Sequence, residues 1–361
     1  MQQVVVVGGG VMGCLGALEL LAAGCSVTLI ERQSAGRESS WAGGGIVSPL
    51  YPWRYPASIS ALANWSQGYY PELGQRLFEA TGIDPELTAC GLLWLDHAEA
   101  DAALAWARAQ GRPIEAVDAD FLYQRVPDLA PGFRGGLWQA DLANVRNPRL
   151  MTALLTYLDQ QSHFRLIENS PVEALLEKGG RVVGVRHAGG QVSADAVVIS
   201  AGAWSGGWLE RTGERLSVDP VKGQMLLYRA EPGWLRSVVL SEGRYAIPRR
   251  DGHVLVGSTL EHAGFDNGTT QEALDSLRAS AAKLLPRLAQ MEPIAQWSGL
   301  RPGSPEGVPF IGEFSGKPGL WVNAGHYRNG LVLAPASCRL LADLMTGRAP
   351  EIDPTPYAPD R

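Results

Sequence analysis

The chain has 361 residues, of which 45% are hydrophobic and 19% are charged. This length and composition predict two domains with a large apolar core. The formal net charge is −6, and basic residues are not clustered. Nucleic acid is therefore excluded as an expected partner, because neutralising backbone phosphates requires grouped Lys and Arg side chains.

The cysteines and the N-terminal stretch indicate the cellular setting. Four cysteines are scattered, with no CxxC pair and no histidine at metal-ligand spacing, so we expect reduced thiols and no metal. Residues 4–30 are apolar and carry a single charged residue, Glu19. Because glycines divide this stretch into strand, turn and helix, we interpret it as part of a cytoplasmic protein that does not enter the membrane.

The first predicted elements form a βαβ unit. A β-branched apolar strand over 4–7 runs directly into GGGVMG at 8–13, which supplies the pattern GxGxxG. A helical pattern follows, and a second apolar strand over 27–30 ends at Glu31. Strand, glycine-rich turn, helix, strand and terminal acid in this order predict a dinucleotide-binding unit.

Each conspicuous residue of this unit has a physical role. Gly8 permits the tight turn, Gly10 lets the backbone approach a pyrophosphate, and Gly13 lets helix and strand pack closely. The helix N-terminus then directs unpaired N–H groups at the phosphates. Glu31 can accept hydrogen bonds from ribose hydroxyls. The unit alone leaves NAD and FAD open.

Three later segments favour FAD. A second glycine-rich stretch, 39–46, suits a loop along a pyrophosphate and an isoalloxazine ring. Residues 171–202 predict short strands joined by glycine turns and a buried strand that ends at Gly202, the three-stranded meander of flavoproteins with two dinucleotide folds. The segments SGLRPG at 298–303 and GHYRNG at 325–330 precede an apolar helix over 331–345.

With these segments the chain resembles the D-amino-acid-oxidase-type FAD-dependent oxidoreductases essentially from end to end, most closely their glycine oxidase branch of thiamin biosynthesis. The resemblance implies FAD-dependent oxidation of glycine, and of sarcosine or small D-amino acids, by molecular oxygen. The products would be the 2-oxo acid, ammonia or amine, and hydrogen peroxide. It also implies a homotetramer. Its most specific parts are GGGVMG, SSWAGGGI (39–46), ISAGAWS (199–205), PVKGQ (220–224), GRYAIPRR (243–250), SGLRPG and GHYRNGLVLAP (325–335).

The resemblance further implies the site residues. Arg301 would hold the substrate carboxylate, and Tyr245, Arg328, Leu260 and Ile46 would line the substrate pocket. The residues expected to contact FAD are Gly8, Gly10, Val11, Met12, Gly13, Glu31, Arg32, Ser39, Ser40, Gly44, Gly45, Ile46, Val172, Gly202, His326, Tyr327, Arg328, Asn329, Gly330, Leu331 and Val332. The FAD is expected to be non-covalent, because no cysteine lies between Gly299 and Gly330.

The expected chemistry places few demands on protein acids and bases. A hydride passes from the substrate α-carbon to flavin N5, so no catalytic acid or base is assigned, and His326 is interpreted as a neighbour of the ring. The helix that begins near Asn329 would direct its first amides at the flavin N1–C2=O edge, which stabilises negative charge there by about 0.3–2 kcal/mol. Arg301 lies in an apolar segment and needs an anionic partner. On residue type alone, that partner is a substrate carboxylate or an internal Asp or Glu.

Two other functions are kept as alternatives. An amino-acid dehydrogenase of the same fold would pass its electrons to a quinone, as in D-amino-acid dehydrogenases or the cyanide-synthase subunit. A flavin-binding regulatory protein without turnover belongs to a different class. It would need neither a loop facing the ring nor an Arg that binds carboxylates.

The expected fold class is α/β with two domains. The FAD-binding domain is discontinuous, over 1–80, 145–215 and 296–361, with a Rossmann-like parallel sheet and the meander. The substrate domain, over 81–144 and 216–295, is of the α+β type on an antiparallel or mixed sheet. Asp251-Gly252 predicts a hairpin turn within it.

Overall fold

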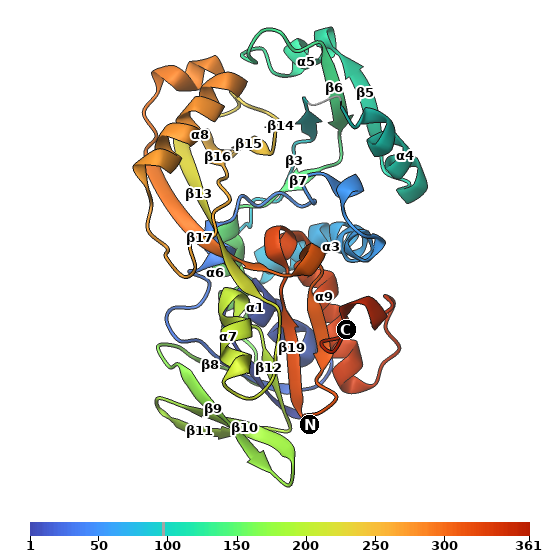
Figure 1. The fold of residues 1–361 in the computed structure, drawn as a ribbon, viewed down its shortest axis with the longest axis vertical. Coiled ribbons are helices and arrows are strands. Elements are labelled where there is room, and N and C mark those ends of the chain that lie inside the picture. Colours follow the sequence, from blue (N-terminus) through green and yellow to red (C-terminus); the bar gives the residue numbers. More distant parts are fainter. Residues whose placement is uncertain (96–97) are drawn as a thin grey trace.

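The computed structural model describes residues 1–95 and 98–361. It contains two regions stacked along the long axis, each built on its own large sheet (Figure 1). We call them the parallel-sheet region, which holds α1, α7 and α9 in the lower half of Figure 1, and the mixed-sheet region, which holds α4, α5 and α8 in the upper half. This α/β, two-domain architecture confirms the predicted fold class.

The parallel sheet has six strands in the order β18-β19-β12-β1-β2-β8. Neighbouring strands are parallel, except that β18 runs antiparallel to β19 at the edge. Strand β1 and strand β12 are apolar and almost wholly buried, as central parallel strands covered on both faces must be. The strands are β1 (Gln3–Val7), β2 (Ser26–Ile30), β8 (Phe164–Ile167), β12 (Ala196–Ile199), β18 (Phe310–Glu313) and β19 (Leu320–Ala324).

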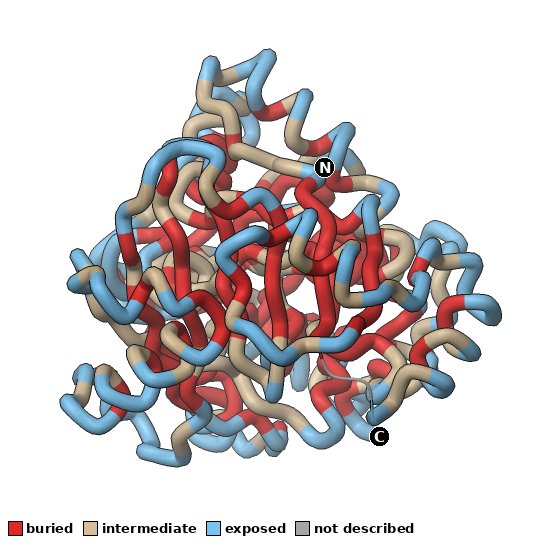
Figure 2. Tube along the Cα trace, turned by 90° about the horizontal axis from the view of Figure 1, so that it is seen from above, coloured by how far each residue is buried: buried red, intermediate tan, exposed pale blue. Residues whose placement is uncertain are grey.

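Alternate side chains of β1 enter two different cores, because successive residues of a strand point to opposite faces. Val4 and Val6 pack with the helices of one face. Val5 and Val7 pack with the meander side of the sheet. Figure 2 shows the buried strands running through the interior. The helices of the first core are α1 (Val11–Ala22), α3 (Ala57–Thr81), α6 (Asn147–Asp159) and α9 (Gly330–Thr346).

The other face of the parallel sheet carries the predicted meander. It is a three-stranded antiparallel sheet of β9 (Val172–Lys178), β10 (Arg181–His187) and β11 (Gly190–Ser193). The short helix α7 (Ser205–Glu210) follows β12 and contributes Trp208 and Leu209 to the same core. The meander therefore completes the covering that a parallel sheet requires.

The mixed sheet has eight strands in the order β17-β13-β16-β15-β14-β4-β6-β5. Among the described residues of this sheet, only β14 and β4 pair in parallel. The predicted hairpin at Asp251-Gly252 joins β15 to β16, with Gly252 at φ +86°. The strands are β4 (Leu92–Trp94), β5 (Ile114–Asp118), β6 (Gly135–Gln139), β13 (Asp219–Arg229), β14 (Val238–Ser241), β15 (Arg244–Pro248), β16 (His253–Gly257) and β17 (Ala295–Gly303).

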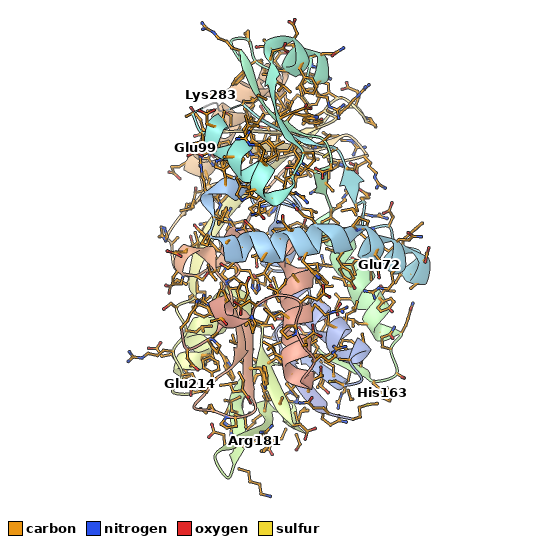
Figure 3. The ribbon with its side chains drawn as sticks, turned by 90° about the vertical axis from the view of Figure 1, so that its right-hand side faces the viewer. Glu72, Glu99, His163, Arg181, Glu214 and Lys283 are labelled. Carbon is orange, nitrogen blue, oxygen red and sulfur yellow. The ribbon has the colours of Figure 1, made fainter. Side chains whose placement is uncertain are left out.

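Strand β17 joins the two regions. It pairs with β13 along its whole length and is thus an edge strand of the mixed sheet. Helix α3, which carries Glu72, crosses the molecule between the two regions (Figure 3). The remaining helices and strands are α2 (Ser39–Ala42), α4 (Ala100–Gln110), α5 (Ala119–Arg125), α8 (Gln271–Leu284), β3 (Thr88–Ala89) and β7 (Ala143–Asn144).

The following statements on membrane-spanning helices, metal-ligand groups and cysteines refer to residues 1–95 and 98–361. Within these ranges no helix combines the length and hydrophobicity that a membrane crossing requires. The same residues contain no group of three or more potential metal ligands. The four cysteines are all buried and free.

Candidate active site

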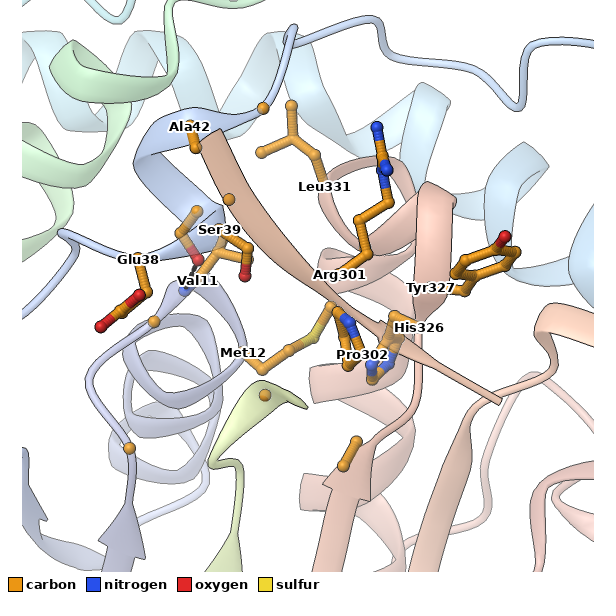
Figure 4. A pocket seen from close by; sticks show the side chains of 18 of the residues that line it. Val11, Met12, Glu38, Ser39, Ala42, Arg301, Pro302, His326, Tyr327 and Leu331 are labelled. Atoms are coloured by element: carbon orange, nitrogen blue, oxygen red, sulfur yellow. Dashed lines mark hydrogen bonds between the residues drawn. The ribbon is translucent and has the colours of Figure 1, made fainter. Parts of the chain in front are cut away.

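A cavity of about 520 Å³ lies between the two regions. Its wall combines the carboxyl ends of β1, β2 and β12 with parts of β13, β15 and β17. Figure 4 shows Glu38 and Ser39 at one end of the cavity and Arg301 and Tyr327 at the other. All the residues expected to contact cofactor or substrate line it, apart from Gly13 and Leu260.

These two exceptions have different reasons. A Cβ atom at position 13 would lie 1.8 Å from the Gly8 carbonyl oxygen, so Gly13 packs α1 against the turn, which is the role that the glycine pattern predicted. Leu260 lies on the segment after β16 and is 48% exposed. It does not line the cavity.

The nucleotide end of the cavity is held by hydrogen bonds to main-chain N–H groups. The Glu31 carboxylate accepts hydrogen bonds from the N–H groups of Gly9 (2.7 Å) and Gln33 (3.0 Å). The Ser40 hydroxyl accepts one from the N–H of Val11, the first residue of α1 (2.8 Å). These bonds fix the acid and the helix N-terminus beside each other, the arrangement that suits a ribose and a pyrophosphate.

The segment 39–46 begins as the short helix α2, where the sequence predicted only a glycine-rich loop. Its later residues pair with the chain around β7: the Val145 N–H donates to the Gly45 carbonyl (2.8 Å), and Ile46 forms a bridge with Asn144. Gly45 has φ +81°, and a Cβ atom there would lie 2.0 Å from the Val145 carbonyl oxygen. A glycine is therefore required at this point of the wall.

Arg301 projects from β17 at the opposite end. Its guanidinium donates to the carbonyls of Lys222 (3.3 Å) and Thr259 (3.2 Å) and to the Ser258 hydroxyl (2.7 Å). Burial lowers the pKa of Arg301, and the nearby Arg328 lowers it further, while Tyr245 and Tyr327 act in the opposite direction. Within the described part of the chain no carboxylate lies within ion-pair distance of Arg301. The alternative that an internal Asp or Glu is the partner of Arg301 is therefore not supported by the described residues.

Glycines on the neighbouring strands make room for this guanidinium and for the Tyr245 ring. A Cβ atom on Gly223 of β13 would lie 2.2 Å from Arg301 Nη2. One on Gly257 of β16 would lie 2.9 Å from Tyr245 Cε2. Tyr245 itself is 7% exposed, and its hydroxyl lies 3.5 Å from the Met225 sulfur. The motif PVKGQ therefore contributes space at Gly223, in addition to the Lys222 carbonyl that accepts a hydrogen bond from Arg301.

The cavity wall contains buried polar atoms without a hydrogen-bond partner among the described residues. Buried polar groups in proteins are nearly always bonded, so such atoms in a cavity wall mark positions for polar atoms of a ligand. The residues around this cavity thus fit a ligand rich in donors and acceptors along its length, as FAD is. The atoms are Asn147 Oδ1, Ser200 Oγ, Asn323 Oδ1, Asn329 Nδ2, His326 Nδ1 and His326 Nε2.

His326 is 1% exposed, and burial lowers its pKa to about 3. Its imidazole is therefore neutral at physiological pH and is a weak base there. This agrees with the interpretation of His326 as a neighbour of the ring. In Figure 4 it lies near Met12 and Pro302, and the exposed Arg328 lines the same cavity two residues further on.

Sequence reasoning did not identify one contact across the cavity. The rings of Trp204 and Phe265 are stacked, with centroids 5.6 Å apart, and the Arg32 guanidinium lies 3.7 Å from the Trp204 centroid on the parallel-sheet side. Trp204 stands in the motif ISAGAWS, and this motif was the one signal in the sequence that could have pointed to it. Phe265 stands in an irregular segment after β16 and carries no local signal.

Comparison with known proteins identifies the family. The model of the DAO family, described as FAD dependent oxidoreductase, matches residues 3–344. The chain is 58% identical to "Glycine oxidase" of Pseudomonas aeruginosa over 99% of this chain and 98% of that protein. It is 31% identical to "Bifunctional protein ThiO/ThiG" of Nostoc sp. over 95% of this chain and 52% of that longer protein.

A solved structure agrees over the full length. Glycine oxidase from Geobacillus kaustophilus superposes with a TM-score of 0.93 at 31% identity, covering 100% of this chain and 99% of the other. The cavity between two sheets and the glycine-rich turn at its nucleotide end therefore have the setting of a flavin site. The chain belongs to the DAO family of FAD-dependent oxidoreductases.

Proposed function

We propose that this enzyme oxidises glycine, and also sarcosine or small D-amino acids, with molecular oxygen as the electron acceptor. Glycine, oxygen and water give glyoxylate, ammonia and hydrogen peroxide. The observation that carries the proposal is Arg301, a cation without a carboxylate partner among the described residues, in a cavity whose wall fits FAD. The similarity to a glycine oxidase supports the choice of glycine, and the similarity to a ThiO/ThiG protein supports a role in thiamin biosynthesis.

Arg301 binds the α-carboxylate of the substrate in this proposal. A guanidinium can engage a carboxylate through two parallel hydrogen bonds, and each charge-assisted bond contributes about 1.5–3 kcal/mol. Hydrogen bonds from Arg301 to Ser258 and to the carbonyls of Lys222 and Thr259 fix its orientation before substrate arrives. The guanidinium therefore loses little freedom when it binds, which favours tight placement of a small molecule.

Two side chains limit the size of the substrate. Tyr245 is buried and lines the cavity beside Arg301, and Ile46 lines it from the segment 39–46. Both are bulky, so an amino acid held by Arg301 has room for only a small substituent on its α-carbon. This favours glycine, sarcosine and D-alanine over larger amines.

The chain would hold FAD with both regions. Glu31 and the N-terminus of α1 suit the adenosine ribose and the pyrophosphate, and the segments 39–46 and 326–332 line the rest of the cavity. When bound, FAD would supply the group that accepts a hydride from the α-carbon of the substrate. The first N–H groups of α9, at Gly330, Leu331 and Val332, lie in the wall and provide a positive dipole end worth about 0.3–2 kcal/mol toward negative charge.

We also propose that the protein is a cytoplasmic homotetramer with a discontinuous FAD-binding domain over 1–80, 145–215 and 296–361. The resemblance to the glycine oxidases supports this assembly. Size-exclusion chromatography with light scattering measures the mass of the assembly directly. A monomeric mass at working concentration would contradict the homotetramer.

A substrate screen tests the reaction. Glycine, sarcosine, D-alanine and L-alanine are offered separately to the FAD-loaded enzyme, and oxygen uptake, peroxide and the 2-oxo acid are measured together. We expect glycine to consume oxygen and to release equal amounts of peroxide and glyoxylate. Reduction of an added dye or quinone without oxygen uptake would show a dehydrogenase instead. No reaction with any small amino acid would refute the proposed function.

A further inference from the structure

Arg249 directly follows β15 and is almost completely enclosed, with 7% of its surface exposed. Its Nη1 donates to the Asn144 side-chain oxygen (2.6 Å) and to the Val145 carbonyl (2.9 Å). Its Nη2 donates to the carbonyl of Gly44 (2.8 Å). One buried guanidinium thus connects the end of β15, the chain around β7 and the cavity-lining segment 39–46.

The charge of Arg249 is balanced by oxygen dipoles. Among the described residues no carboxylate lies within ion-pair distance of it. Burial lowers its pKa to about 10, with a further lowering from Arg146, while Glu86, Cys90 and Asp251 act in the opposite direction. The group therefore remains charged at neutral pH. A buried cation held only by neutral oxygens is costly for stability alone, which suggests a purpose at the place that it holds.

Arg249 holds a part of the cavity wall in place. Gly44 lines the cavity and lies between Arg249 and the side chains of β15, since a Cβ atom on Gly44 would be 2.7 Å from Ile247 Cδ1 and 3.4 Å from Tyr245 Cε2. The strand that presents Tyr245 to the cavity is the strand whose end carries Arg249. The Gly44 carbonyl is thus fixed from the same element that carries a wall of the substrate end.

We propose that Arg249 is a positioning residue that fixes residues 43–46 against the flavin and aligns them with the Tyr245 side of the substrate pocket. Its planar guanidinium meets three oxygens on two separate segments at once. A lysine has one point of attachment and cannot hold these oxygens in one plane. The proposal rests on the proposed function for its kinetic consequence, but its effect on the cofactor is independent of the substrate.

Arg250 provides a matched control. It is the next residue and also a tethered arginine, with hydrogen bonds to Asp84 (2.6 Å), the Thr88 hydroxyl (2.9 Å) and the Leu87 carbonyl (2.7 Å). Its side chain is 46% exposed, however, and it does not contact the segment 39–46 or line the cavity. A change at Arg250 therefore removes a similar set of bonds away from the flavin.

The experiment compares Arg249→Lys and Arg250→Met with the wild type as full-length, FAD-loaded protein. The FAD dissociation constant is measured by titrating the apoprotein, and the visible flavin spectrum is recorded without substrate. For Arg249→Lys we expect a folded protein with at least tenfold weaker FAD binding and an altered visible band. We also expect a lower kcat for glycine, with a smaller change in KM. Arg250→Met should stay within twofold of the wild type in every quantity.

Three outcomes would contradict the role proposed for Arg249. Unchanged FAD affinity and spectrum in Arg249→Lys would show that Arg249 does not position the flavin wall. An insoluble or unfolded Arg249→Lys would assign Arg249 to general stability, since a positioning role predicts a folded apoprotein. Equal effects of Arg249→Lys and Arg250→Met would show that the loss does not depend on the contact of Arg249 with the cavity wall. If the wild type does not oxidise glycine while Arg249→Lys still loses FAD affinity, the proposed function fails and the role of Arg249 stands.

Discussion

The two ends of the cavity differ in how their polar groups are satisfied. At the nucleotide end, Glu31 and Ser40 accept hydrogen bonds from main-chain N–H groups of the turn and of α1. At the flavin and substrate end, His326 and Asn329 have polar atoms without partners among the described residues, and Arg301 has only neutral acceptors. The nucleotide end is thus shaped mainly by backbone N–H groups, although the hydroxyl of Ser200, which packs against Gly8, also lacks a partner among the described residues. The other end presents a guanidinium and an imidazole that a ligand must satisfy.

If this comparison is right, the largest effect comes from Arg301→Ala. The change removes two charge-assisted bonds to a carboxylate, together worth about 3–6 kcal/mol, so KM for glycine should rise by a factor of at least about 100 while FAD stays bound. Steady-state kinetics and the flavin content measure both. Leu260→Ala, at a position that the sequence assigned to the pocket but the structure exposes, is the control and should change KM less than about twofold. Unchanged glycine kinetics in Arg301→Ala would contradict the assignment.

Glu31→Gln should give the opposite pattern at the nucleotide end. Losing the negative charge weakens hydrogen bonds to ribose hydroxyls by about 1.5 kcal/mol, which corresponds to roughly tenfold weaker FAD binding. KM for glycine in the FAD-saturated enzyme should remain close to the wild-type value. Glu38→Gln, whose carboxylate already pairs with Arg32 (2.8 Å) near the surface, is the comparison and should have a smaller effect. A Glu31→Gln enzyme with altered KM but normal FAD affinity would contradict the assignment of Glu31 to FAD binding.

Gly223→Ala tests whether the space beside Arg301 matters. The added methyl group would lie 2.2 Å from Nη2, so the guanidinium must move, and we expect KM to rise about tenfold with FAD affinity unchanged. Gly68→Ala, on the exposed face of α3, adds the same group where no atom lies within 4 Å. That control should leave the kinetics unchanged. Equal kinetics in Gly223→Ala and Gly68→Ala would mean that the space beside Arg301 does not determine KM for glycine.

His326 should leave a signature in the pH dependence of stability. Burial lowers its pKa to about 3, so between about pH 6.5 and 3 the unfolded chain binds a proton that the folded protein does not. The free energy of unfolding therefore falls as the pH falls through this window. By pH 5 the wild type should lose about 2 kcal/mol more, relative to pH 7.5, than His326→Gln. Denaturant titrations at the two pH values measure this, and equal losses would contradict a neutral, buried imidazole.

Local patterns predicted the nucleotide end well. The strand, turn, helix and strand at the N-terminus follow from periodicity and glycine spacing within one short segment, and β1, α1 and β2 have the expected order. The meander and the hairpin at Asp251-Gly252 follow from similar local signals. In each case the residues that decide the structure are close together in the chain.

Contacts between segments that are distant in the chain could not be predicted from such local patterns. The pairing of β17 with β13 places SGLRPG in the mixed sheet, and nothing in that segment specifies its partner strand. The stack of Phe265 on Trp204 and the bonds from Arg249 to Gly44 also join residues that are far apart in sequence. Leu260 was assigned to the pocket by resemblance alone, and the structure leaves it exposed and outside the cavity wall.

In the proposed function, Arg301 presents an amino acid to a flavin held between the two sheets. Mixing the FAD-loaded enzyme with glycine in the absence of oxygen tests it most directly. We expect the yellow colour to bleach, and admitting air should restore it with release of hydrogen peroxide. An enzyme with bound FAD that no small amino acid can bleach would contradict it.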